Sequence, residues 1–154
     1  MGVLAADVNF RTYGNTCNKF TFSGNVADIH YAGAIVYIDT AGGVQAVPAA
    51  GDMFAGISTK NQTVVNAGDP VECYVDGIFL VPVGSGITAA DEGDLLIYDI
   101  SGATASDNWA DMVSNLDVTG AANDIVIGRI LRVTTEGMWI KLEPKLCVTN
   151  VGWV

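Results

Sequence analysis

The sequence offers few residues that could carry out acid–base, nucleophilic or metal chemistry. His30 is the single histidine, so a Ser-His-Asp triad, a Cys-His pair or a multi-histidine metal site would depend on it. It lies in NVADIHYAG, among apolar neighbours at the entry to a predicted strand, which favours a structural histidine over a catalytic one. We therefore predict that the chain is not an enzyme and has no catalytic residues, no cofactor and no metal.

The densest group of carboxylates lies in one short segment and leaves two interpretations open. Its spacing does not match the calcium-binding loop of an EF-hand. A cation site at a subunit contact is one interpretation, and a solvated turn is the other. The group consists of Asp91, Glu92, Asp94 and Asp99.

The cysteines form no recognisable ligand pattern. Cys17, Cys73 and Cys147 are an odd number, and no Cys-x-x-Cys occurs, so a zinc site is not supported. We expect reduced thiols, with Cys73 packed in the core as a small apolar side chain.

One glycine-rich segment matches a nucleotide-binding pattern. GSGITA, residues 84–89, fits the dinucleotide fingerprint with a final alanine and follows a predicted strand. That fingerprint requires a helix directly afterwards, whereas Asp91-Glu92-Gly93 leads into another predicted strand. We therefore interpret the segment as a turn.

Charge and composition bound the class of partner. The 154 residues are 50% hydrophobic and 16% charged, which predicts one domain with a packed core. The net charge is −10, and residues 61–128 hold eleven Asp and Glu with no Lys or Arg, whereas residues 129–145 hold four cations against two Glu. Such an acidic surface disfavours nucleic acid and anionic membranes as partners. The charge either serves solubility alone, or the acidic middle and the cationic ends meet different surfaces.

Short β-patterned segments dominate the chain. They are rich in Val, Ile, Phe and Tyr and are punctuated by Gly or Asp, which predicts an all-β sandwich or small barrel. Asp76-Gly77, Glu136-Gly137 and residues 40–43 are typical of hairpin turns. The predicted strands are Lys19–Ser23, Ala34–Asp39, Val44–Pro48, Met53–Ser58, Pro70–Asp76, Ile78–Val83, Asp94–Asp99, Asp124–Val133 and Met138–Glu143.

One short helix and two terminal arms complete the expected organisation. In SDNWADMVSNLD, apolar residues fall at helical spacing and predict a helix over about residues 107–117. Residues 1–18 alternate poorly and are expected to form an extended arm. Residues 19–144 form the barrel or sandwich domain, and residues 145–154 form a C-terminal tail.

Two parts of the chain echo each other. GAIVYID, residues 33–39, is similar to GDLLIYD, residues 93–99, and each precedes an apolar strand with a central glycine, Gly56 or Gly128. A Gly-Asp pair also occurs three times before predicted strands. The echo indicates either an internal duplication or a coincidence in a glycine-rich β protein.

The order of these elements resembles a known family. The series GAIVYID, AAGDMFAGIST, NAGDPVECYVDGIFLVPV, DEGDLLIYD, IVIGRILRV and MWIKLEP is similar to the small β-barrel decoration, or cement, proteins of tailed-bacteriophage heads. The resemblance spans about residues 33–144 and implies a protein that binds the outer surface of an expanded capsid, generally as a homotrimer. The implied partners are the major capsid protein and further copies of the chain.

The two ends lie outside the resemblance, and their roles are inferred from their residues. We expect the N-terminal arm to add an extended strand to a neighbouring sheet or capsid edge, with aromatic side chains in pockets and cations facing carboxylates. We expect an aromatic anchor near the C-terminus. The predicted contact residues are Phe10, Arg11, Tyr13, Lys19, Phe20, Val151, Trp153 and Val154.

Other interpretations remain at this stage. The chain could be another structural protein of the virion, or a module that binds glycans or proteins at a surface. A trimeric all-β nucleotide hydrolase is a third, but the Asp- and Ser-containing motifs that such enzymes need are not found in the sequence.

Overall fold

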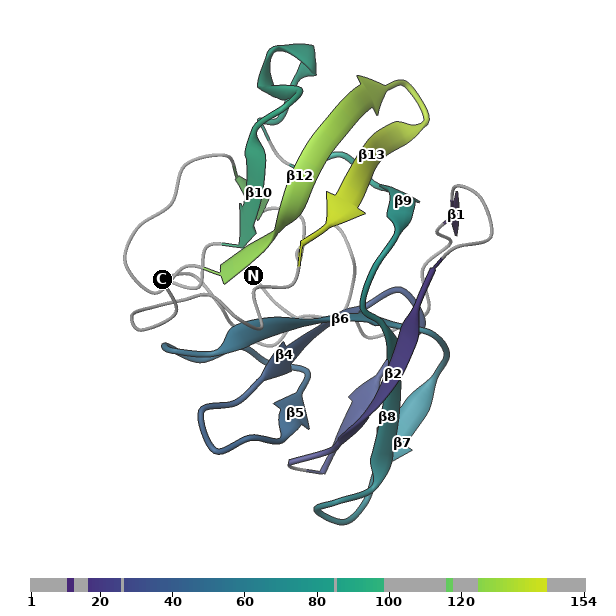
Figure 1. Ribbon diagram of the computed structural model, residues 1–154, viewed down its shortest axis with the longest axis vertical. Helices are drawn as coiled ribbons and strands as arrows, with labels where there is room; N and C mark the ends of the chain where they lie inside the picture. Colours follow the sequence, from purple (N-terminus) through teal and green to yellow (C-terminus); the bar gives the residue numbers. More distant parts are fainter. Residues whose placement is uncertain are drawn as a thin grey trace.

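The computed structural model describes residues 11–12, 17–25, 27–84, 86–98, 116–117 and 125–143. These residues form two antiparallel β-sheets that pack together, with a short two-stranded ribbon beside them (Figure 1). The predicted all-β class with short antiparallel strands is therefore confirmed.

The first sheet has five strands in the order β2-β8-β6-β4-β5, and every pairing within it is antiparallel. A parallel bridge joins Gly24, directly after β2, to Val44 of β5. Because this bridge links the two ends of the strand order, the sheet curls towards closure. Its strands are β2 (Lys19–Ser23), β4 (Ile35–Ile38), β5 (Val44–Gln45), β6 (Met53–Ser58) and β8 (Pro70–Tyr74).

The second sheet has six strands in the order β1-β9-β13-β12-β10-β11, again all antiparallel. A single turn of 3₁₀-helix, η1 (Ala89–Asp91), precedes its strand β10. The strands are β1 (Arg11–Thr12), β9 (Ile78–Val81), β10 (Leu95–Tyr98), β11 (Leu116–Asp117), β12 (Ile125–Thr134) and β13 (Gly137–Leu142).

The ribbon consists of β3 (Asp28–His30) and β7 (Gln62–Val64), neither of which the sequence analysis predicted. The amide of Gln62 ties β7 to its neighbours: its Nε2 donates to Ser58 Oγ (2.8 Å) and to Glu72 O (2.9 Å), and its Oε1 accepts from Glu72 N (2.7 Å). These bonds satisfy a buried side chain and hold β7 against the end of β6 and the middle of β8.

Two of the three predicted hairpins are confirmed and one is wrong. Residues 40–43 join β4 to β5, and Glu136-Gly137 closes the β12–β13 hairpin. Asp76-Gly77, however, carries the chain from β8 in the first sheet to β9 in the second. The positive φ of Gly77, +121°, serves this crossing between sheets instead of a hairpin.

The helix predicted over residues 107–117 is wrong at its end. Leu116 and Asp117 form strand β11 and pair with Tyr98 and Ile97 of β10. This pairing gives the edge of β10 a partner for its backbone hydrogen bonds. Residues 107–115 lie outside the described residues.

Apolar side chains form two clusters on opposite faces of the first sheet. Ile35 and Tyr37 of β4 belong to the cluster shared with the second sheet, whereas Val36 between them belongs to the other cluster. Burial on both faces explains why β4 and β6 are almost continuously apolar instead of alternating. The second cluster contains Val36, Val44, Ala55, Val64, Val71 and Cys73.

The two sheets contain the same four-stranded unit twice. Strands β2, β4, β6 and β8, here called the first unit, correspond in chain order to β9, β10, β12 and β13, the second unit. In each unit the spatial order is first, fourth, third, second, and all pairings are antiparallel. The sequence echo between residues 33–39 and 93–99 falls on the second strand of each unit.

The register is also repeated. In the first unit Val36 lies opposite Gly56, and a register shift follows directly after Val36. In the second unit Leu96 lies opposite Gly128, and a register shift follows directly after Leu96. The bulge and the glycine that faces it therefore occupy equivalent places in the two units.

Three pairs of backbone hydrogen bonds at the unit margins match as well. Together with the shared order and register, they establish an internal structural repeat. The matched pairs are Gly33 N to Ser58 O (2.9 Å) with Gly93 N to Ile130 O (2.8 Å), Ser58 N to Ala34 O (2.9 Å) with Ile130 N to Asp94 O (2.9 Å), and Val75 N to Asn18 O (2.9 Å) with Leu142 N to Gly77 O (3.0 Å).

The two units are stacked front to back: equivalent faces point in the same direction, so one face of the first unit packs against the opposite face of the second unit. Ile57 and Tyr74 of the first unit pack into the core shared with the second sheet. By the register, their equivalents in the second unit are Arg129 and Lys141, which are exposed. The face that is buried in the first unit is therefore the outer surface of the second unit.

Candidate interaction surface

His30 has no access to a substrate. It is completely buried on β3, and its Nε2 lies 2.9 Å from Asp28 Oδ1 without hydrogen-bond geometry. Asp28 Oδ2 accepts a hydrogen bond from Ala46 N (2.9 Å), so the carboxylate links the ribbon to the chain after β5. This setting is structural, as the sequence analysis expected, although Nδ1 of His30 has no hydrogen-bond partner in the described part of the chain.

The two described cysteines are not activated nucleophiles. Burial raises the pKa of Cys73 to about 12, and Glu72 beside it adds to this effect. Burial also raises the pKa of Cys17, whose thiol lies where a side chain at Gly77 would be. Cysteines that react readily have lowered pKa values, so both thiols are packing groups. Cys147 lies outside the described residues.

The carboxylates near η1 are used for internal hydrogen bonds. Asp91 forms a capping box with Thr88, and Glu92 Oε1 accepts from Val133 N (2.8 Å) on β12. Within the described residues, which exclude Asp99, no group of three or more His, Cys, Asp or Glu could hold a metal ion. The turn interpretation of this segment is the one that its geometry favours.

The glycine-rich segment 84–89 also behaves as a turn. Ile87 N donates to Gly84 O (3.1 Å), and Thr88 then caps the single turn of η1. Three 3₁₀ residues provide no helix N-terminus of the kind that holds a pyrophosphate. This geometry agrees with the interpretation of the segment as a turn.

Two of the predicted contact residues, Lys19 and Phe20, lie on β2, which is at one end of the strand order of the first sheet. Phe20 is 58% exposed and meets Phe22 edge-on, with ring centroids 4.9 Å apart. Lys19 Nζ lies 5.2 Å from the centre of the Tyr74 ring and 3.9 Å from Glu72 Oε1. Lys19, Glu72 and Tyr74 lie on one face of the β2–β8 pair, and Phe20 and Phe22 lie on the other; we call these five residues together the β2 surface.

Glu72 is held in its charged form at this surface. The hydrogen bond from Thr59 Oγ1 (2.7 Å) is the main cause that lowers the pKa of Glu72, and Lys19 adds to it. The ammonium group and the carboxylate therefore lie together on one face of the β2–β8 pair, and the exposed ring of Phe20 lies on the other face. A protein segment can contact the first face through charge and the second through its aromatic ring.

The other predicted contact residues are only partly placed. Arg11 and Thr12 form β1, and their backbones pair with Leu80 and Phe79 of β9, so this part of the arm extends the sheet of its own chain. The remaining five lie outside the described residues: Phe10, Tyr13, Val151, Trp153 and Val154.

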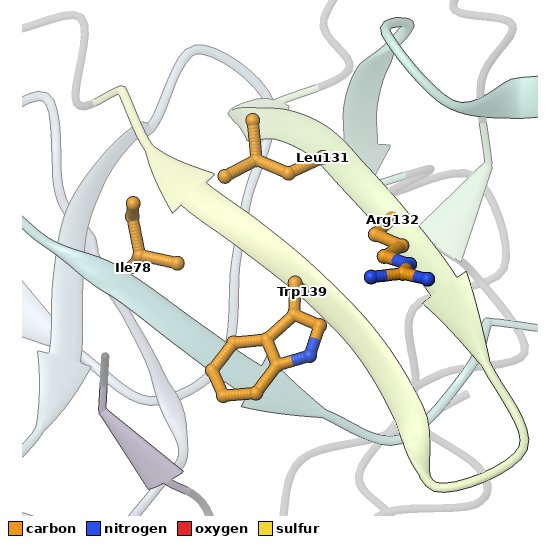
Figure 2. Close-up of a pocket in the computed structure, with 4 residues that line it drawn as sticks. All are labelled: Ile78, Leu131, Arg132 and Trp139. Carbon is orange, nitrogen blue, oxygen red and sulfur yellow. The ribbon is translucent and has the colours of Figure 1, made fainter.

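A second surface was not predicted from the sequence. The outer face of the second unit contains a depression of about 310 Å³ lined by Ile78, Leu131, Arg132 and Trp139, which come from the neighbouring strands β9, β12 and β13 (Figure 2). The alternation in GMWIKL contained a signal for it. Met138, Ile140 and Leu142 are core residues, which places Trp139 and Lys141 on the opposite face.

Comparison with known proteins supplies no relative: no family model, no curated protein and no solved structure matches this chain. Among the described residues, no helix is long and apolar enough to cross a membrane.

Proposed function

We propose that this protein is a capsid decoration (cement) protein of a tailed bacteriophage. It binds the outer surface of the expanded head as a homotrimer and stabilises the shell. Its partners are the major capsid protein and two further copies of itself, its location is the surface of the virion, and it carries out no reaction.

The β2 surface is the observation that carries this proposal. β2 lies at one end of the strand order of the first sheet, before the bridge at Gly24, and it carries Lys19 on one face and the exposed ring of Phe20 on the other. A strand edge can accept a further strand from a partner, and aromatic side chains concentrate the binding energy of an interface. The front-to-back stacking of the two units is also consistent with the proposal, because one shared core joins both units into a single packed body.

Stabilisation follows from selective binding. A ligand that binds only the expanded lattice lowers the free energy of that state in proportion to the logarithm of its concentration over its Kd. Because many copies engage one shell, moderate affinities combine into a large effect.

Co-sedimentation with unexpanded and expanded heads of the virus tests the proposal. Selective, saturable binding of the full chain to expanded heads is expected. Binding to neither form would overturn the proposed function and would favour another structural protein of the virion or a surface-binding module.

Phe20→Ala tests the β2 surface within the same assay. We expect about tenfold weaker binding to expanded heads, because the substitution removes a large exposed anchor. Thr21→Ala is the matched control, since Thr21 is the next exposed residue of the same strand. Equal binding of the two variants would assign the contact to another surface.

A further inference from the structure

The outer face of the second unit combines a concentration of cations with an apolar centre. Arg129, Arg132 and Lys141, three of the seven Lys and Arg of the chain, are exposed on β12 and β13. Arg132 lies directly opposite Trp139 in the strand register, and Leu131 beside it is 41% exposed. In a chain with net charge −10, such a face is a local exception to the overall charge.

The strand register also places two like charges against each other. Arg129 lies directly opposite Lys141 across the β12–β13 pair. Like charges at directly opposed positions destabilise a sheet. Arg129 is partly compensated, since its Nη1 donates to Gly93 O (2.6 Å) and its Nε lies 3.7 Å from Glu143 Oε1.

No such compensation is present at the other two cations. Among the residues that the structure describes, neither Arg132 nor Lys141 lies within ion-pair distance of a carboxylate. Within the described part of the chain, these two cations are therefore not neutralised, and Arg132 lines the same depression as Ile78 and Trp139 (Figure 2).

The internal repeat shows how this face differs from its counterpart in the first unit. Arg129 and Lys141 stand where the first unit has Ile57 and Tyr74, which pack into the core shared with the second sheet. Trp139 stands where the first unit has Glu72, so the charged and the uncharged positions are exchanged between the two units.

We propose that the face formed by Ile78, Arg132, Trp139 and Lys141 binds an acidic extended segment of the shell protein, and this inference rests on the proposed function. A bulky apolar side chain of that segment enters the depression beside Trp139, and carboxylates next to it in the segment pair with Arg132 and Lys141. The two cations are complementary in charge to the carboxylates of such a segment.

Charge reversal of single exposed cations tests the assignment. The full-length wild type, Arg132→Glu, Lys141→Glu and Lys60→Glu are compared by co-sedimentation with expanded heads. Lys60 is an exposed cation between β6 and β7 of the first half of the chain, near Glu72, and its reversal changes the net charge by the same amount. We expect each of the first two variants to bind at least about tenfold more weakly than the wild type, and Lys60→Glu to stay within about twofold.

The remaining outcomes separate the two proposals. If all four proteins bind expanded heads equally, the assignment of this face is overturned and the proposed function stands. If the wild type itself fails to bind, the proposed function falls and this inference falls with it. If Arg132→Glu or Lys141→Glu instead reduces the molar mass of the free protein in sedimentation equilibrium, the face joins copies of this chain and the shell-segment inference is wrong. Circular dichroism melting curves confirm that each variant is folded.

Discussion

Gly56 of β6 and Gly128 of β12 make the same contact in the two halves of the molecule. A Cβ atom at Gly56 would lie 2.2 Å from the carbonyl oxygen of Tyr74, and one at Gly128 would lie 2.0 Å from that of Lys141. Tyr74 and Lys141 are equivalent residues in the repeat. At both positions the next strand passes too close for any side chain, so glycine is required by space.

Alanine at either glycine is therefore expected to destabilise the fold strongly. Gly56→Ala and Gly128→Ala should each lower the free energy of unfolding by about 3 kcal/mol, because the backbone of the neighbouring strand must move. Gly68→Ala is the control: its φ is +97° and its surroundings are open, so only conformational strain of about 1–2 kcal/mol applies. Urea denaturation measures all three, and equal losses would contradict the steric explanation.

The buried amide of Gln62 gives a second prediction. Gln62→Ala removes three hydrogen bonds that join β7 to the last residue of β6 and to the middle of β8, and it leaves the backbone N–H of Glu72 without its acceptor. We expect a loss of about 2–4 kcal/mol in the free energy of unfolding. Thr63→Ala, at the neighbouring exposed position, should change it by less than about 0.5 kcal/mol. Similar effects of both substitutions in thermal denaturation would show that β7 contributes little.

Much of the sheet structure could be predicted from local pattern. Strands β2 and β6 begin and end where the apolar and β-branched residues predicted, and the echo between residues 33–39 and 93–99 indicated the repeat. Which strands pair with each other could not be predicted from local pattern. Asp76-Gly77 has the chemistry of a hairpin turn, but local sequence does not decide whether the next strand returns to the same sheet.

The missed elements share a physical cause. β3 and β7 are three residues long, and a buried His30 and Gln62 stand where an apolar residue would have given a signal. Their stability comes from partners distant in the sequence. The cationic outer face was missed for the same reason: Arg132 and Trp139 become neighbours only through the register of β12 and β13, which a bulge shifts.

The Gly68-Asp69 turn predicts a specific dependence of stability on pH. Backbone N–H groups of Asn66 and Val65 donate to the Asp69 carboxylate (both 2.9 Å) and lower its pKa below the ordinary value of 3.8. Because the folded state holds the carboxylate ionised, its contribution is fully present above about pH 3.8 and is lost as the pH falls through the folded pKa.

Asp69→Asn tests this dependence. The variant should lose less stability than the wild type between pH 4 and pH 2, since no proton binds at this position on unfolding. Thermal melting temperatures across that range give the comparison, with Asp94→Asn, at the next Gly-Asp pair, as the control. Parallel curves for the wild type and Asp69→Asn would show that the turn does not depend on the charge.

The raised pKa of Cys73 gives the last prediction. With a pKa of about 12 and a fully buried side chain, Cys73 holds almost no thiolate at pH 8, so iodoacetamide should not label it in the folded protein. Labelling should become complete in 6 M guanidinium chloride, where burial no longer suppresses ionisation. Peptide mass spectrometry distinguishes Cys73 from Cys17 and Cys147 in one digest. Rapid modification of Cys73 under native conditions would mean that β8 opens often, and this would contradict the packing of Cys73 in the second apolar cluster.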